Sequence, residues 1–274
     1  MGSRRMTAAE DPRGQAVLLL RLAAPLQSWG YASAFNRRET RPEPTKSGIV
    51  GLLAAAQGRA REDDISDLAA LRLGVRVDQP GTLLRDFHTV SDYRGRPLLQ
   101  SGVTAKGVQK PTSPAKYTHV TQRYYLQDAV FLAAVGGPGP LIEALDDAVR
   151  SPAFPLALGR RSCVPTQPIR LGLRRGGVEA ALRDEPWQVS EHARNAHCRR
   201  AGGRPARVDL NATVDDDSGD DVLGDVPRSF DPLRRGFTSR RVRHVRVSAP
   251  TGIRNPDSPD QLPSGHDPFA LLGW

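Results

Sequence analysis

Two stretches decide the fold of this chain: Ala16-Val-Leu-Leu-Leu-Arg-Leu22 and Thr45-Lys-Ser-Gly-Ile-Val-Gly-Leu-Leu-Ala-Ala-Ala-Gln-Gly58. The first is short and almost continuously apolar, which predicts a buried strand. The second predicts a helix that Gly58 ends and that Thr45 can cap, with Ser47 as a competing cap. Its apolar residues form one stripe at i, i+3, i+4 and i+7, namely Ile49, Leu52, Leu53 and Ala56. Gly48 and Gly51 are poor helix formers, so we expect another element or a ligand to approach the helix closely there.

Weaker sequence patterns predict further helices and strands along the chain. They predict a short helix at 63–71, strands at 73–79 and 83–90, a long strand at 122–135, a helix from Pro140 and a basic strand at 240–247. The order fits an α+β fold with a ferredoxin-like antiparallel sheet and helices on one face, the arrangement of RRM-type RNA-binding modules.

The chain divides into three parts by composition. Residues 1–14 are interpreted as a tail or vector-derived residues, and 15–171 as the ferredoxin-like domain, with a long loop at about 94–122. Residues 172–274 are expected to be irregular. Their charged insert, about 199–239, contains the acidic run Asp215–Asp221, and such a run is typical of a mobile segment.

The charge of the chain favours a polyanionic partner. The 274 residues carry a formal net charge of +9, which suits nucleic acid or an anionic membrane surface, although Arg used for general solubility would give the same balance. No apolar stretch is long enough for a membrane span, so we expect a cytoplasmic protein without a membrane partner. The two cysteines, Cys163 and Cys198, form no C-x-x-C motif, which predicts neither a metal site nor a cofactor.

The long loop holds the first set of candidate RNA-binding residues. It interleaves cations that could bind phosphates with rings that could stack on a displaced base: Lys106, Lys110, Lys116, Tyr117, His119 and Arg123. A solvated surface loop is an equally good interpretation. His88, His119, Tyr117 and Lys116 could also form an acid–base set for RNA cleavage without metal, although their spacing does not require it.

The second set lies at the start of the first helix and in a later loop. A helix N-terminus favours phosphate, and paired arginines after Gly159 could bind one phosphate together. These candidates are Arg37, Arg38, Lys46, Ser47, Arg160 and Arg161. An ordinary capped helix explains the first four as well, and the P-loop motif of nucleotide hydrolysis is absent from the sequence.

Five blocks in order resemble the CasD family of type I-E CRISPR Cascade complexes, over about residues 16–171. They are Leu18-Leu-Leu-Arg-Leu-Ala-Ala-Pro-Leu-Gln-Ser-Trp-Gly30, Pro44-Thr-Lys-Ser-Gly-Ile-Val-Gly-Leu-Leu-Ala-Ala55, Arg85-Asp-Phe-His-Thr-Val90, Arg123-Tyr-Tyr-Leu-Gln-Asp-Ala129 and Leu158-Gly-Arg-Arg-Ser-Cys163. The resemblance implies a RAMP-type fold whose thumb is the loop at about 94–122. It implies a non-catalytic subunit in antiviral defence that binds the crRNA 5′ handle and caps the backbone filament. The implied partners are the backbone subunit, the large subunit and target DNA within the assembled complex.

The resemblance also leaves an enzymatic alternative open. Type I-C relatives of the family process precursor crRNA themselves, so a metal-independent endoribonuclease is the second interpretation of this sequence. A basic RNA-binding protein unrelated to CRISPR is the third, and the five ordered blocks disfavour it.

Overall fold

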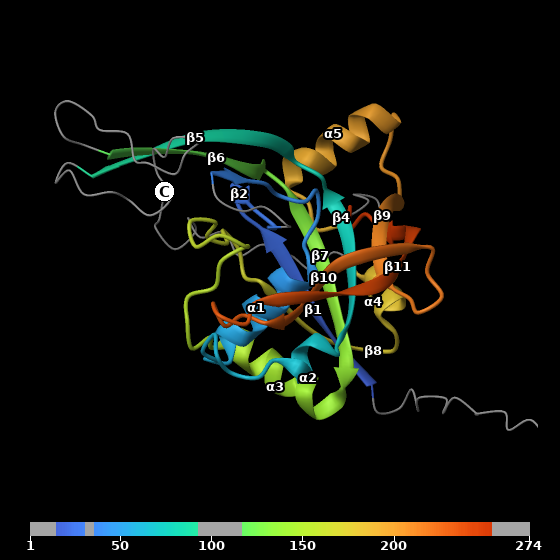
Figure 1. The fold of residues 1–274 in the computed structure, drawn as a ribbon. Helices are drawn as coiled ribbons and strands as arrows, with labels where there is room; N and C mark the ends of the chain where they lie inside the picture. The colour runs from blue at the N-terminus through green and yellow to red at the C-terminus, as the bar shows by residue number, and fades with distance from the viewer. Residues whose placement is uncertain (1–14, 31–35, 93–116, 254–274) are drawn as a thin grey trace, which may run out of the picture.

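The computed structural model describes residues 15–30, 36–92 and 117–253 (Figure 1). Its largest feature is a sheet of antiparallel neighbours in the order β10-β11-β9-β4-β7-β1-β8. These strands are β1 (Gln15–Ala23), β4 (Arg72–Gln79), β7 (Val130–Pro138), β8 (Arg170–Arg175), β9 (Arg207–Asp215), β10 (Asp221–Ser229) and β11 (Gly236–Pro250). The structure is therefore a mixed α/β fold with antiparallel sheets.

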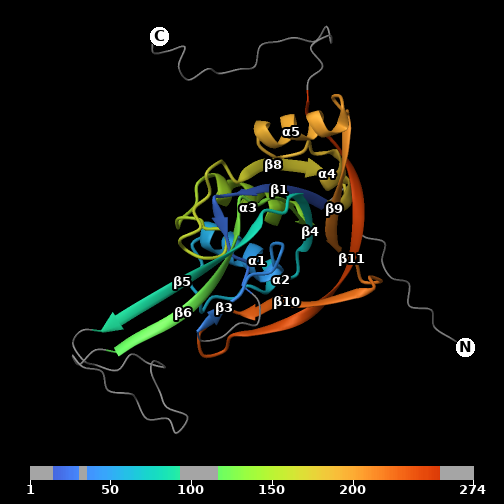
Figure 2. The same cartoon turned by 90° about the horizontal axis from the view of Figure 1, so that it is seen from above.

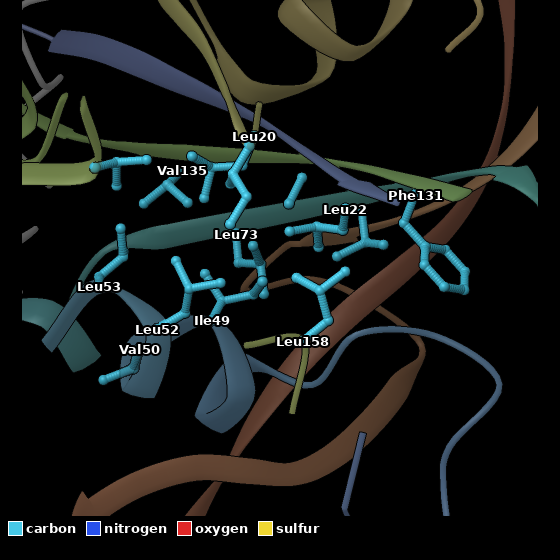
Figure 3. Close-up of a cluster of buried hydrophobic side chains, with 14 of the residues drawn as sticks. Leu20, Leu22, Ile49, Val50, Leu52, Leu53, Leu73, Phe131, Val135 and Leu158 are labelled. Atoms are coloured by element: carbon cyan, nitrogen blue, oxygen red, sulfur yellow. The ribbon is translucent and has the colours of Figure 1, made fainter. Parts of the chain in front are cut away.

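The helices cover both faces of this sheet, because β1 is apolar on both. Leu18, Leu20 and Leu22 pack with α1 (Lys46–Ala56), α2 (Ser66–Ala69) and α3 (Gly139–Arg150), as Figure 3 shows for α1. Val17 and Leu19 face the opposite core, which α4 (Val178–Asp184) covers. The expectation of helices on one face is thus wrong for α4.

The start of α1 confirms the predicted cap and the predicted close approach. The Thr45 hydroxyl accepts a hydrogen bond from the Gly48 N–H at 3.2 Å. A Cβ on Gly48 would lie 2.7 Å from Cε3 of Trp29, whose side chain is fully buried. At Gly51, by contrast, the nearest atom to an added Cβ is a ring carbon of Phe230, at 3.5 Å. Gly48 therefore makes room for the Trp29 ring against the helix.

A hairpin of β5 (Thr82–Asp92) and β6 (Tyr117–Gln127) projects from the body of the molecule (Figures 1 and 2). β6 belongs to a second sheet with β2 (Leu26–Gln27) and β3 (Arg37–Arg38). Two predictions are corrected here. Residues 117–122 are strand and not loop, and the predicted strand 122–135 is two strands that part at Asp128, where φ is 56°.

The C-terminal region is also more regular than predicted. Helix α5 (Glu191–Ala201) is followed by β9, β10 and β11, which extend the large sheet, so the insert at about 199–239 is not an irregular segment. Most acidic residues of its run at 215–221 have partners. Asp215 binds Lys46 at 3.0 Å and also Arg240, and hydrogen bonds from Ser218 and Arg243 lower the pKa of Asp216 to about 2. Because these carboxylates bind basic side chains of the protein, they stabilise an ordered end of β9 and not a mobile segment.

Candidate nucleic-acid interface

Basic residues gather where the β5–β6 hairpin meets the body. β3 runs parallel to β6, which places Arg37 beside Gln122 and Arg38 beside Arg123. The Arg37 guanidinium lies 5.3 Å from the ring centroid of Tyr124 and 2.7 Å from a Glu39 carboxylate oxygen. Both Arg37 and Arg38 are exposed. The short β3 strand thus presents two arginines at the base of the hairpin.

A loop after α3 brings Arg160 and Arg161 to the same place. Gly159, with φ of +89°, lies so close to Ser28 that an added Cβ would be 1.8 Å from the Ser28 carbonyl oxygen. The Ser28 N–H donates to the Leu158 carbonyl at 3.2 Å, which fixes the loop against the end of β2. A residue with a side chain could not make this approach.

Arg160 then joins the loop to the hairpin. Its Nη2 donates to the Arg38 carbonyl at 2.8 Å, and its guanidinium lies 4.5 Å from the ring centroid of Tyr125. Arg161 is exposed beside it. We call this set the hairpin-base cluster, and its members are Arg37, Arg38, Arg123, Arg160, Arg161, Tyr124 and Tyr125.

Two guanidinium atoms of the cluster have no protein partner. Within the described residues, Nε of Arg123 and Nη1 of Arg160 are shielded from solvent and make no hydrogen bond. A buried donor without an acceptor costs about 1–3 kcal/mol, and more when the group is charged. Such atoms are suited to an anionic ligand, and Arg favours phosphate because its planar donors bind two oxygens at once. The cluster can therefore hold phosphates beside the partly exposed ring of Tyr124, whereas Tyr125 is buried beneath Arg160.

The tyrosines of the cluster were not among the predicted site residues. Tyr124 and Tyr125 follow Arg123 directly, so the run Arg-Tyr-Tyr carried a usable signal of cations beside stacking rings. Arg85 was missed as well. It pairs in register with Tyr124 across the hairpin and is exposed, and only the strand register reveals this.

The start of α1 is not part of the cluster's free basic surface. Lys46 is buried, its ammonium binds Asp215 at 3.0 Å, and its backbone N–H donates to Asp225 at 2.8 Å. Protein carboxylates thus bind the backbone N–H and one of the three ammonium donors of Lys46, which disfavours the predicted RNA contact at this residue. Ser47 is half-buried, with its hydroxyl 3.2 Å from that of Thr45.

The structure describes only part of the predicted loop set. Lys106, Lys110 and Lys116 lie outside the described residues, while Tyr117 and His119 enter β6 in register with Asp92 and Val90. His88 lies on β5 in register with Thr121, with Nδ1 3.9 Å from an Asp86 oxygen.

In the part of the chain that the structure describes, no group of three or more His, Cys, Asp or Glu residues could hold a metal ion. No helix there is both long and apolar enough to cross a membrane.

Solved structures place this architecture among CRISPR proteins. A chain of a structure described as "CRISPR RNA-guided surveillance complex" is 36% identical, with a TM-score of 0.64 over 85% of this chain and 91% of that one. A second, described as "Crystal structure of Cas protein", is 39% identical, with a TM-score of 0.61 over 86% of this chain and 95% of that one.

Sequence comparison gives the family. Residues 17–243 match the family described as "CRISPR-associated protein (Cas_Cas5)". The CRISPR system Cascade subunit CasD of Escherichia coli (strain K12) is 38% identical over an alignment of 174 residues that covers 57% of this chain and 70% of that protein. This chain therefore belongs to the CRISPR-associated Cas_Cas5 family, as the five sequence blocks predicted.

Proposed function

We propose that this chain is a non-catalytic subunit of a type I-E Cascade surveillance complex in antiviral defence. In this role it binds the 5′ handle of the crRNA and caps one end of the backbone filament. Its partners are the backbone subunit, the large subunit and, in the assembled complex, target DNA. The CasD relative of Escherichia coli supports the assignment to Cascade, since it carries that name at 38% identity.

The core of the sheet supports a ferredoxin-like arrangement. β1, α1, β4, β7, α3 and β8 follow one another as strand, helix, strand, strand, helix and strand. The four strands lie in the order β4-β7-β1-β8, which places the last beside the first and the third between the first and the second. We infer that this unit is the RAMP-type core and that the β5–β6 hairpin, inserted between β4 and β7, is its thumb.

The unpaired donors of Arg123 and Arg160 carry the proposal of RNA binding. They lie where the hairpin leaves the body, next to the partly exposed Tyr124, while Tyr125 is buried and its ring supports the Arg160 guanidinium. A strand that bends around the hairpin base would therefore meet charge and one accessible ring. Each charged hydrogen bond to phosphate contributes about 1.5–3 kcal/mol, which corresponds to roughly a tenfold or larger change in affinity for each arginine lost.

The test uses the full chain with crRNA and the other Cascade subunits. We expect Arg123→Gln with Arg160→Gln to weaken binding of a 5′-handle RNA by about a hundredfold and to reduce co-assembly on a sizing column. Arg161→Gln changes only an exposed cluster residue and should weaken binding without affecting the thermal unfolding temperature. The control is Arg183→Gln, because this exposed α4 residue pairs with Glu179.

Two results would overturn the proposal. Unchanged binding in the double variant, with unchanged unfolding, would refute the hairpin-base cluster as the handle site. Cleavage of a precursor repeat by the chain alone, without metal and lost in His88→Ala, would show the endoribonuclease instead.

A further inference from the structure

A second pair of arginines lies on the other side of the molecule, between β1 and α5. Arg21 follows Val17 and Leu19 along β1, so it faces the side of the sheet that α4 covers. Arg194 lies in the first half of α5, with Nη2 donating to the Trp187 carbonyl at 2.8 Å. Figure 2 shows α5 on the side of the body opposite the β5–β6 hairpin. This pair is therefore separate from the hairpin-base cluster.

Both arginines have an unsatisfied, shielded donor. Within residues 15–30, 36–92 and 117–253, the Nε atoms of Arg21 and Arg194 are hidden from solvent and make no hydrogen bond. Burial, and after it the nearby charge of Arg194, lowers the pKa of Arg21, and Asp78 offsets only part of this. The strand register agrees with this, since Arg21 and Arg76 both pair with Leu132, and Arg76 donates to the carbonyls of Glu185 and Pro186, which directly precede the Arg194 partner Trp187. Two partly buried charges of the same sign therefore lie in one region without full compensation, which is unfavourable unless an anion binds there.

The neighbouring carboxylates are already bound to other groups. Asp78 binds Arg76 through both oxygens, at 2.7 and 2.8 Å, and also accepts from the Gln188 N–H. Glu185 binds Arg174 at 2.6 Å. Arg76 shows what a satisfied arginine looks like here, since it also donates to the carbonyls of Glu185 and Pro186. Among the residues that the structure describes, these carboxylates therefore bind other groups, and neither Arg21 nor Arg194 has a carboxylate of its own.

We propose that Arg21 and Arg194 form an anion site for the phosphodiester backbone of a nucleic-acid strand that runs along α5. Arg199 and Arg200, both exposed in the last turn, add positive charge at the end of α5. They lie about 7.5–9 Å along the axis from Arg194 and about 120–140° around it, so a strand that contacts both groups passes around the end of the helix.

The surface of α5 favours nucleic acid over an acidic protein. α5 buries none of its residues, and none of the exposed large apolar side chains of the described chain lies on it. Protein interfaces usually gain their affinity from apolar or aromatic anchors, whereas phosphate binding needs only placed charges.

The test compares two double variants of the full chain that lose the same charge. Arg21→Gln with Arg194→Gln removes the proposed site. Arg72→Gln with Arg183→Gln removes two exposed arginines that already pair with Asp217 and Glu179. Fluorescence anisotropy with single-stranded RNA and with DNA of the same sequence, at several salt concentrations, measures binding, and the RNA and DNA arms identify the source of the phosphates.

We expect the first variant to bind at least tenfold more weakly to one of these strands. The slope of log affinity against log salt should fall by about 1.4, which is two phosphate contacts at about 0.7 each, while the control changes little. Without nucleic acid, its thermal unfolding temperature should change little, because the loss of the Arg194 hydrogen bond to the Trp187 carbonyl opposes the relief of repulsion. The same variant made in the Arg123→Gln, Arg160→Gln background should show a further loss, which separates this site from the proposed handle site.

Three results would overturn the proposal. An equal loss in both double variants would mean a general charge effect, and a marked fall in unfolding temperature would mean a structural role. Unchanged nucleic-acid binding together with lost binding of polyglutamate would mean an acidic protein partner instead.

Discussion

Replacing Gly159 by alanine should damage both stability and RNA binding. The residue has φ of +89°, a conformation that costs a residue with a side chain about 1–2 kcal/mol. The new Cβ would lie 1.8 Å from the Ser28 carbonyl oxygen and 2.7 Å from its carbonyl carbon. Because these are backbone atoms, the loop itself must move, at a cost comparable to overpacking, about 1–3 kcal/mol. The sum is about 2–5 kcal/mol.

Urea unfolding followed by the fluorescence of Trp29 and Trp187 measures this loss, and the unfolding temperature should fall by roughly 5–15 °C. Two glycines serve as controls. Gly202 has φ of +66° with nothing within 4 Å of an added Cβ, so its alanine variant reports the backbone strain alone. Gly203 has neither the strain nor a close neighbour.

The displaced loop carries Arg160 and Arg161, so Gly159→Ala should also weaken binding of handle RNA, whereas the two controls should not. If Gly159→Ala cost no more than Gly202→Ala, the close approach of this loop to Ser28 would not be a real constraint.

Two further predictions concern the core and the buried charges. Gly48→Ala should destabilise the protein by about 1–2 kcal/mol, because the buried Trp29 ring occupies the space of the new Cβ. Gly51→Ala should stabilise it by about 0.5–1 kcal/mol, because alanine has the higher helix propensity and its Cβ has room. Equal free energies of unfolding for the two variants in urea would contradict this. Asp225→Ala should cost about 3–5 kcal/mol, since it leaves Arg240 buried without this partner. Burial raises the pKa of Asp225, but hydrogen bonding and the charge of Arg240 outweigh it and hold the pKa below its ordinary value. The contribution of Asp225 to stability is therefore present above about pH 4 and lost as the pH falls. The difference in free energy of unfolding between wild type and variant should become smaller in acid, and an unchanged difference would refute the ion pair.

The elements that sequence predicts well are those with local signals. Thr45 and the apolar stripe of α1 gave the helix and its cap, and α3 contains Pro140 in its first turn, as the sequence predicted. β6 was partly missed because its beginning lies in the projecting hairpin, where apolar side chains need not be buried and the residues need not alternate between apolar and polar. Val120 and Phe87, for example, are exposed although they are apolar.

The C-terminal strands were missed for a different reason. Asp215 begins a run that, by itself, predicts a solvated segment, and its partner Lys46 is 169 residues away in sequence. Separation in sequence also limits how much of the hairpin-base cluster can be predicted. Arg160 could be named as a candidate, but its position over Tyr125 and its bond to Arg38 depend on the folded loop.

The bonds between α1 and the C-terminal strands also set an order of events during synthesis. The backbone N–H of Lys46 donates to Asp225, which lies 179 residues later in the sequence. Arg240, which forms an ion pair with Asp225, lies later still. While β9 to β11 are still being synthesised, the nascent chain contains α1 and the Lys46 ammonium. It does not yet contain Asp215 and Asp225, the carboxylates that bind Lys46 in the folded protein. Contacts of such long sequence separation form late in folding. The contacts of α1 with Asp215 and Asp225 can therefore form only after nearly all of the described chain has been synthesised. Until then, the exposed start of α1 is the region that a chaperone would need to protect.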